Sequence, residues 1–240
     1  MVINLDDRKT LFELGHKYYN NQEYNKAIKY FKRVTVLYPH YFEAHFYLSA
    51  AYELSGLLDN AIEEFEILVR LKPRDKQLKD FLLRLYFKTK SYRKAVRILR
   101  ELYRLYPHSP EYVMLLSEAL FYSARYTAAA KILTDLHKTS PYNEKALFNL
   151  MLVFREQRKL KKAKKTCNKL VARFPENPVY HYFLGTIYED MKNYKKMRKH
   201  FDRAYSLMQL ETTDDRELFI EISKRLNKTG LNGKSLKFMS

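Results

Sequence analysis

The chain has 240 residues, of which 46% are hydrophobic and 15% aromatic, and its formal net charge is +18 at pH 7. Five glycines are too few for long flexible linkers, and a single cysteine, Cys167, excludes an internal disulfide and a thiolate metal cluster. No apolar run is long enough to predict a transmembrane segment, and residues 1–7 lack the pattern of a secretory signal. We therefore expect a cytoplasmic protein, or one at the periphery of a membrane-bound assembly.

A proline recurs every 34 residues along the chain, at Pro39, Pro73, Pro107, Pro141 and Pro175. Because proline interrupts helices, a fixed interval between prolines indicates stacked copies of one unit. A leucine column from Leu14 to Leu184 and an alanine column from Ala27 to Ala163 keep the same spacing. The pattern predicts six copies, at 8–41, 42–75, 76–109, 110–143, 144–177 and 178–211.

Each copy contains two apolar blocks. In the first copy, apolar residues recur at steps of three and four from Leu11 and again from Ala27, with the polar segment 20–23 between them. This pattern predicts two amphipathic helices joined by a tight turn. The small side chain of Ala27 would let the two helices approach closely.

The segment Leu-x-x-Leu-Gly-x-x-Tyr at 11–18, followed by Ala27, Phe31 and Pro39, closely resembles the tetratricopeptide repeat. The six copies cover 204 of the 240 residues, although tryptophan never fills the first signature position and Met151 replaces a small residue in copy five. The resemblance implies an all-α, right-handed superhelical α-solenoid. Its first helices would line a concave groove, and its second helices would lie outside.

Residues 212–228 follow the sixth copy and contain an apolar stripe of Leu218, Phe219, Ile222 and Leu226. A solenoid needs a cap over its exposed end, so we predict a capping helix here. Residues 1–228 would then form one solenoid domain. The glycine-broken segment 229–240 is expected to be a mobile C-terminal tail.

The groove positions implied by the resemblance are rich in aromatic residues. The predicted partner-binding residues are Phe12, Tyr19, Phe46, Tyr47, Phe81, Arg84, Phe87, Met114, Phe121, Tyr122, Phe148, Tyr182 and Phe183. About half should pack between helices, and the others should form an exposed apolar strip. Nine acids and five bases share the groove positions, a net of −4 that is unsuited to phosphates. The expected ligand is an apolar, mildly basic peptide or helix.

The positive charge lies elsewhere, because residues 155–203 hold fifteen Lys or Arg and five acids. A predicted basic patch on the convex side contains Lys159, Lys161, Lys162, Lys164, Lys165, Lys169, Lys195, Lys196, Arg198 and Lys199. It is either a solvated face or a patch for an acidic protein or an anionic membrane surface. Nucleic acid is the least favoured partner, since single-strand binding needs stacking rings beside the cations.

Nothing in the sequence indicates catalysis. The seven histidines are scattered, with no metal-ligand spacing and no phosphate-binding glycine loop, so we predict no enzyme, metal or cofactor. His45 and His181 occupy the first signature position and should be partly packed, and Cys167 should be a core residue.

These patterns predict a non-enzymatic scaffold or adaptor. It would bind a peptide or helix of a protein partner in the aromatic groove and support assembly of a larger complex. One alternative is a structural, self-associating protomer of an envelope or motility assembly. A nucleic-acid-associated repeat protein that uses the basic side is a weaker alternative.

Overall fold

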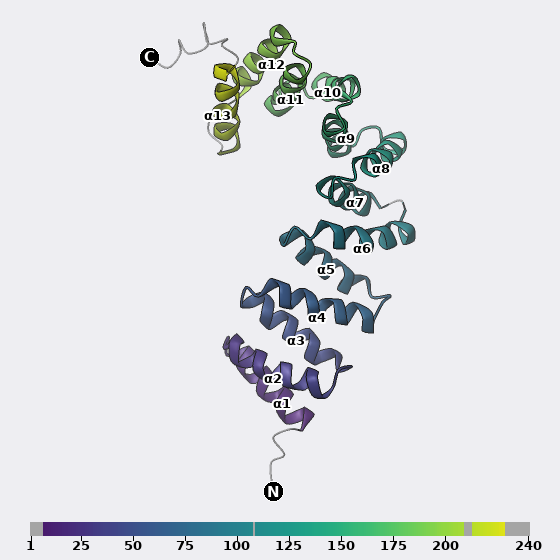
Figure 1. The fold of residues 1–240 in the computed structure, drawn as a ribbon, viewed down its shortest axis with the longest axis vertical. Coiled ribbons are helices and arrows are strands. Elements are labelled where there is room, and N and C mark those ends of the chain that lie inside the picture. Colours follow the sequence, from purple (N-terminus) through teal and green to yellow (C-terminus); the bar gives the residue numbers. More distant parts are fainter. Residues whose placement is uncertain (1–6, 108, 209–212, 229–240) are drawn as a thin grey trace. The chain divides into compact units, whose positions relative to one another are not determined.

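The computed structural model describes residues 7–107, 109–208 and 213–228, which form thirteen α-helices and no strand (Figure 1). The helices are α1 (Arg8–Asn20), α2 (Tyr24–Leu37), α3 (Phe42–Leu54), α4 (Leu58–Leu71), α5 (Lys76–Lys88), α6 (Tyr92–Leu105), α7 (Pro110–Tyr122), α8 (Tyr126–Thr139), α9 (Glu144–Glu156), α10 (Leu160–Arg173), α11 (Pro178–Asp190), α12 (Tyr194–Leu207) and α13 (Thr213–Lys228).

The first twelve helices form six pairs, one pair in each predicted copy. The first helix of every pair has 13 residues and the second has 14. Each first helix therefore begins 34 residues after the previous one. The predicted all-α repeat fold is confirmed.

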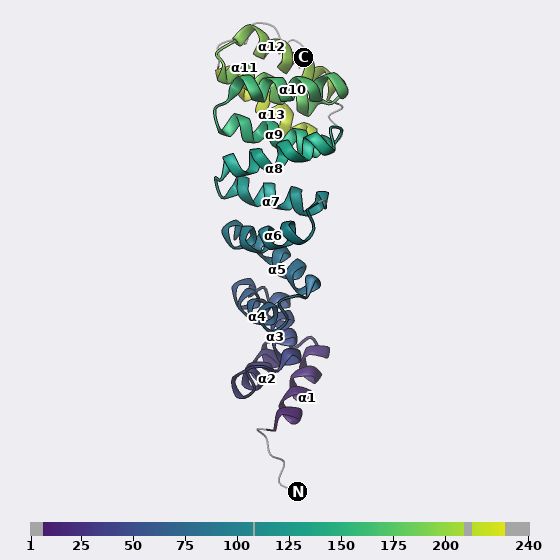
Figure 2. The ribbon, with the colours of Figure 1, turned by 90° about the vertical axis from the view of Figure 1, so that its right-hand side faces the viewer.

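The chain divides into two compact units, Met1–Glu101 and Leu102–Ser240, and the division falls within α6. Unit 1 contains α1 to α5, and unit 2 contains α7 to α13. Within unit 2, Figure 2 shows the pairs α7–α8 and α9–α10 in successive layers. The single solenoid domain predicted for 1–228 stays a prediction.

The turn inside each pair has one residue with a positive φ, and these residues also recur every 34 positions: Gln22, Gly56, Lys90, Ala124, Arg158 and Lys192. In the first pair, the N–H of Gln22 donates to the carbonyl of Tyr19, and the N–H of Glu23 donates to the carbonyl of Tyr18. These two bonds form a Schellman cap, which satisfies carbonyls at the end of α1. Five of the six positions hold a residue other than glycine, although a Cβ disfavours this conformation.

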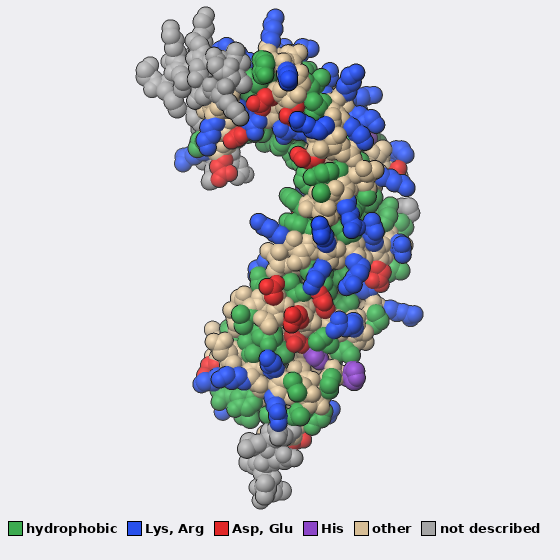
Figure 3. Space-filling model, viewed as in Figure 1, with side chains coloured by type: hydrophobic (Ala, Val, Ile, Leu, Met, Phe, Trp, Pro, Cys, Tyr) green, Lys and Arg blue, Asp and Glu red, His purple; other side chains and the backbone are tan. Residues whose placement is uncertain are grey.

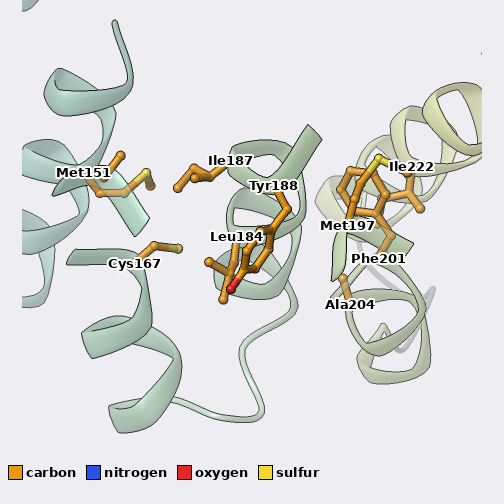
Figure 4. Packing of buried hydrophobic residues seen from close by; sticks show 10 residues of the cluster. Met151, Cys167, Leu184, Ile187, Tyr188, Met197, Phe201, Ala204 and Ile222 are labelled. Atoms are coloured by element: carbon orange, nitrogen blue, oxygen red, sulfur yellow. The ribbon is translucent and has the colours of Figure 1, made fainter. Parts of the chain in front are cut away.

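Close approach of the two helices in a pair depends on complementary residue sizes. In repeat six, a Cβ on Gly185 would lie 2.4 Å from the ring of buried Phe201, so only glycine fits opposite this ring. In repeat five the same positions hold Met151 and Cys167, both fully buried and part of one cluster (Figure 4). The larger Met151 is compatible with close packing because Cys167 is smaller than phenylalanine. Cys167 is a core residue as expected, and burial raises the pKa of its thiol to about 12.

The segment predicted as a capping helix contains α13. Its Ile222 is fully buried in the cluster that contains Met197 and Phe201 of α12, and Leu218 packs against this cluster (Figure 4). The side chains of Phe219 and Leu226, and the predicted tail 229–240, lie outside the described residues.

Candidate functional site

All thirteen predicted partner-binding residues lie on first helices of the pairs. Unit 1 holds seven of them: Phe12, Tyr19, Phe46, Tyr47, Phe81, Arg84 and Phe87. Unit 2 holds the other six: Met114, Phe121, Tyr122, Phe148, Tyr182 and Phe183. Four of the thirteen are exposed, namely Phe46, Phe81, Arg84 and Tyr122, and the other nine are half-buried.

In unit 1 the predicted aromatic residues pack largely against one another. The ring of Tyr47 lies 5.0 to 5.9 Å, between centroids, from the rings of Phe12, His16, Tyr19, Phe31 and Phe46. Such edge and stacked contacts between rings stabilise the packing of α1, α2 and α3. A hollow of about 670 Å³ borders this cluster. Most of the ring surface in unit 1 is therefore used for folding.

Arg84 on α5 also makes contacts within unit 1. Its guanidinium lies 3.2 Å from the carboxylate of Glu53 on α3 and stacks over the ring of Phe81 at 5.1 Å. A ligand that used Arg84 would have to compete with Glu53.

Unit 2 contains a pocket of about 730 Å³ on the side of its first helices. α7 contributes Met114, Leu115 and Glu118 to the lining, and α9 contributes Phe148 and Asn149. All five side chains are half-buried, so one part of each packs within the protein and another part is accessible to a ligand. Residues from the start of α11 close the pocket. Two of the predicted binding residues, Met114 and Phe148, are thus brought together.

Glu118 is the most unusual group in this pocket. Burial raises the pKa of its carboxyl group, and no other described residue forms a hydrogen bond or ion pair with it. Glu111, two helical turns nearer the start of α7, is exposed and likewise has no such partner in the described part of the chain. The repeat register places Glu118 on the groove side. Its burial without an ion-pair partner among the described residues distinguishes it from half-buried groove acids such as Glu53 and Asp190, which are paired.

The wall of the pocket on α9 and α11 is held by specific contacts. The hydroxyl of Tyr180 donates a hydrogen bond to Glu144, and burial together with this bond raises the pKa of Tyr180. The ring of Phe148 lies 5.9 Å from that of Tyr180 and 5.0 Å from that of Phe183. The pocket wall is therefore fixed before any ligand binds.

Several groove charges counted in the sequence neutralise one another. Arg155 on α9 lies 2.7 Å from Asp190 on α11, and Glu189 on α11 lies 2.6 Å from Arg225 on α13. These pairs link successive first helices and α13 within unit 2. Among the described residues, Glu118 remains a half-buried acid without an ion-pair partner.

The ten residues of the predicted basic patch belong to the second helices α10 and α12 of unit 2, with Lys159 as the residue before α10. Eight are exposed, and Lys164 and Arg198 are half-buried. The patch and the pocket thus lie on different helices of the same unit.

Over residues 7–107, 109–208 and 213–228, no three His, Cys, Asp or Glu side chains are placed to hold a metal ion. None of the helices described is long and apolar enough to cross a membrane.

Comparison with known proteins supports the repeat assignment. Tetratricopeptide repeat family models match residues 12–76 and 82–144, residues 120–187, and residues 179–207. No curated protein matches the chain.

Solved structures resemble the fold at low sequence identity. MamA from residue 41 to its end, from Desulfovibrio magneticus RS-1, is 19% identical with a TM-score of 0.59, covering 72% of this chain and 97% of that one. A chain of Naa15/Naa10 bound to HypK-THB is 15% identical with a TM-score of 0.69; the match covers 91% of this chain and 34% of that one. A tetratricopeptide repeat protein from Parabacteroides merdae ATCC 43184 is 13% identical with a TM-score of 0.50, and the match covers 92% of this chain and 86% of that one.

Tetratricopeptide repeats generally act as scaffolds that bind protein or peptide partners, and they are generally not enzymes. The family models, the 34-residue period and the paired helices agree along the chain. The chain therefore belongs to the tetratricopeptide repeat family.

Proposed function

We propose that this protein is an adaptor whose unit 2 pocket binds a peptide segment carrying an apolar side chain and a nearby lysine or arginine. Binding of this segment would support assembly of a larger complex. The observation that carries the proposal is Glu118, a half-buried carboxylate without a partner among the described residues, in a pocket lined by Met114 and Phe148.

The chemistry of the lining favours such a ligand. A cation beside Glu118 would stabilise the ionised carboxylate and offset its desolvation. The half-buried side chains of Met114, Leu115 and Phe148 offer apolar surface for a ligand side chain. The amide of Asn149 can both donate to and accept from a peptide backbone. A peptide would thus meet each type of group in the pocket.

Selection from a phage-displayed library of random dodecapeptides tests the proposal. We expect the enriched peptides to combine an apolar residue with lysine or arginine. Binding of a synthesised selected peptide, measured by fluorescence anisotropy, should weaken about 10- to 100-fold in Glu118→Gln, because a charge-assisted hydrogen bond is lost. Glu156→Gln is the matched control, since Glu156 is an exposed acid of α9 outside the pocket lining.

The apolar contacts give a second test with its own control. Met114→Ala combined with Phe148→Ala should weaken the selected peptide further, whereas Phe46→Ala in unit 1 should leave its affinity unchanged. The opposite result would place the binding surface on unit 1. Peptides without a basic residue, or equal affinity for wild type and Glu118→Gln, would contradict the role given to Glu118.

A further inference from the structure

The second helices of the last two complete repeats carry cations at five identical repeat positions. The pairs, each 34 residues apart, are Lys161 and Lys195, Lys162 and Lys196, Lys164 and Arg198, Lys165 and Lys199, and Lys169 and Arg203. We call these ten residues the cationic ladder. Figure 3 shows lysine and arginine side chains crowded on the surface over α10 and α12. The repetition places the cations of the two helices on equivalent faces within unit 2.

The fold does not require this charge. α4, the second helix of repeat two, carries Asp59, Glu63, Glu64 and Glu66 instead. α10 has no acidic residue, and α12 has one, Asp202. Lysines four residues apart on one helix also repel each other, which opposes helix formation. A feature present in two repeats and unfavourable to their helices indicates a role outside folding.

Most of the ladder is not neutralised within the protein. Arg203 pairs with Glu176 at 2.8 Å, and Arg198 lies 3.7 Å from Asp202. Several ladder lysines have no hydrogen bond from the ammonium group and no ion pair with a described residue: Lys161, Lys164, Lys165, Lys195 and Lys199. Four of these five are exposed, and Lys164 is half-buried. The ladder therefore presents free positive charge to solvent.

The uncharged residues between the cations indicate which class of partner fits this surface. Apart from Tyr194, the exposed uncharged residues of these two helices are small or polar, namely Asn168, Ala172 and Ser206. A protein interface is usually depleted of lysine and has an apolar or aromatic centre, and single-stranded nucleic acid needs stacking rings. The exposed aromatic of α12, Tyr194, is its first residue and lies outside the ladder positions.

We propose that the cationic ladder binds unit 2 to an anionic lipid surface through electrostatic attraction alone. Lysine predominates in the ladder, and its ammonium is a compact charge without the fork geometry by which arginine pairs with phosphate or base edges. Lipid headgroups form a diffuse negative layer that attracts clusters of four to eight such cations without specific geometry. The ladder lies on second helices and the peptide pocket on first helices, so either function can fail without the other.

Co-sedimentation with lipid vesicles tests this proposal with the full chain. The vesicles contain phosphatidylcholine alone or phosphatidylcholine with phosphatidylserine at about 30 mol%, the anionic lipid class that attracts basic clusters. Wild type should bind the phosphatidylserine vesicles, bind less as salt is raised, and not bind phosphatidylcholine alone. The combined variant K161E, K165E, K195E and K199E should lower the partition coefficient at least about 100-fold.

A charge-matched control separates the ladder from net charge. The variant K17E, K29E, K32E and K88E changes the same number of exposed lysines in unit 1. It should lower the partition coefficient less than about fivefold, because screening limits each contact to about 10 Å. Circular dichroism checks that both variants remain helical.

Three outcomes would overturn the proposal. The first is an equal loss of binding in the two variants, and the second is equal binding of wild type to both vesicle types. The third is no vesicle binding together with ladder-dependent binding of a single-stranded RNA of about 20 nucleotides, a length sufficient for a single-strand binding site. The third would assign the ladder to nucleic acid.

Discussion

Two buried histidines, His45 in unit 1 and His181 in unit 2, occupy the same repeat position but have different partners. Nε2 of each ring lies 3.0 Å from a proline carbonyl, that of Pro39 or Pro175. Because a carbonyl only accepts, Nε2 must carry the proton in both rings. The repeated backbone thus dictates one hydrogen bond of each histidine. Both side chains are almost inaccessible to solvent, more so than the partial packing expected from the sequence.

The second ring nitrogen meets a residue 19 positions later, and this residue differs between the two repeats. Nδ1 of His45 lies 2.5 Å from the carboxylate of Glu64, whereas Nδ1 of His181 lies 3.3 Å from Nδ1 of His200. Burial opposes a charge on His45, but hydrogen bonds to Glu64 and the proline carbonyl raise its pKa overall. Burial, His181 and two nearby lysines lower the pKa of His200 to about 4. One substitution in a repeat can therefore reverse which charge state the fold stabilises.

Removal of each histidine should give the largest difference between the two repeats. His45→Ala leaves the Glu64 carboxylate largely buried without its cation, which should cost about 3–5 kcal/mol of folding free energy. His181→Ala leaves only the neutral imidazole of His200 without its partner, and we expect a smaller cost of about 2 kcal/mol. Amide hydrogen exchange of α3 and α4, compared with α11 and α12, measures each repeat separately. Equal costs would contradict a charged His45–Glu64 pair.

Changing the pH should affect the two repeats in opposite directions. The folded pKa of His200 lies below its unfolded value near 6.5, so the stability it contributes is present above pH 6.5. That contribution is lost as pH falls toward 4 and amounts to as much as about 3 kcal/mol. The folded pKa of His45 is raised, so its contribution is complete below pH 6.5 and is lost as pH rises through the folded pKa.

Exchange rates of α3–α4 and α11–α12, corrected for the intrinsic effect of pH, provide the measurement. Acid should accelerate opening of α11 and α12, and mild alkali that of α3 and α4. A common slope for both pairs would show that these histidines do not control local stability.

Replacing His200, the partner of His181, by glutamate should give repeat six the pH dependence of repeat two. In His200→Glu a carboxylate faces His181. Lys196 and Lys199 disfavour a positive charge on His200, but they would stabilise the negative charge of a glutamate at this position. We expect α11 and α12 to become most stable below about pH 6.5, with a gain near 1 kcal/mol there. His200→Gln is the uncharged control and should remove most of the pH dependence. Retention of the acid-sensitive slope in His200→Glu would argue against the comparison.

The sequence was sufficient to predict the arrangement of helices but not the pairs of side chains. Prolines such as Pro39 fix the start of each repeat, and the columns of Leu14 and Ala27 fix which faces are buried. Periodicity reports these properties because they depend on backbone geometry, which every copy shares. The same logic located Cys167 in the core.

The properties of the binding surface depend on individual side chains and were less predictable. A count of groove charges treats Arg155 as free, whereas the structure pairs it with Asp190, 35 residues later. Glu118 has the same repeat position as Arg84, and it is distinctive only because the folded pocket buries its carboxyl group without an ion-pair partner among the described residues. The contacts of the rings around Tyr47 likewise depend on three helices that meet only after folding.

The smallest predicted effect concerns the turns of two other equivalent sites, Gly56 in unit 1 and Ala124 in unit 2. Their φ angles are 76° and 58°, a conformation that costs about 1 kcal/mol or more with a Cβ. Nothing lies within 4 Å of a Cβ added to Gly56, so Gly56→Ala tests backbone strain without a steric clash. Gly56→Ala should destabilise the protein by about 1 kcal/mol, and Ala124→Gly should stabilise it by up to that amount. Urea unfolding measures both, with Gly56→Asn as a control of intermediate cost. Effects of opposite sign would assign the difference to φ itself, whereas a neutral Gly56→Ala would contradict a cost of the positive φ at this turn, because the backbone hydrogen bonds of the cap are present with either residue.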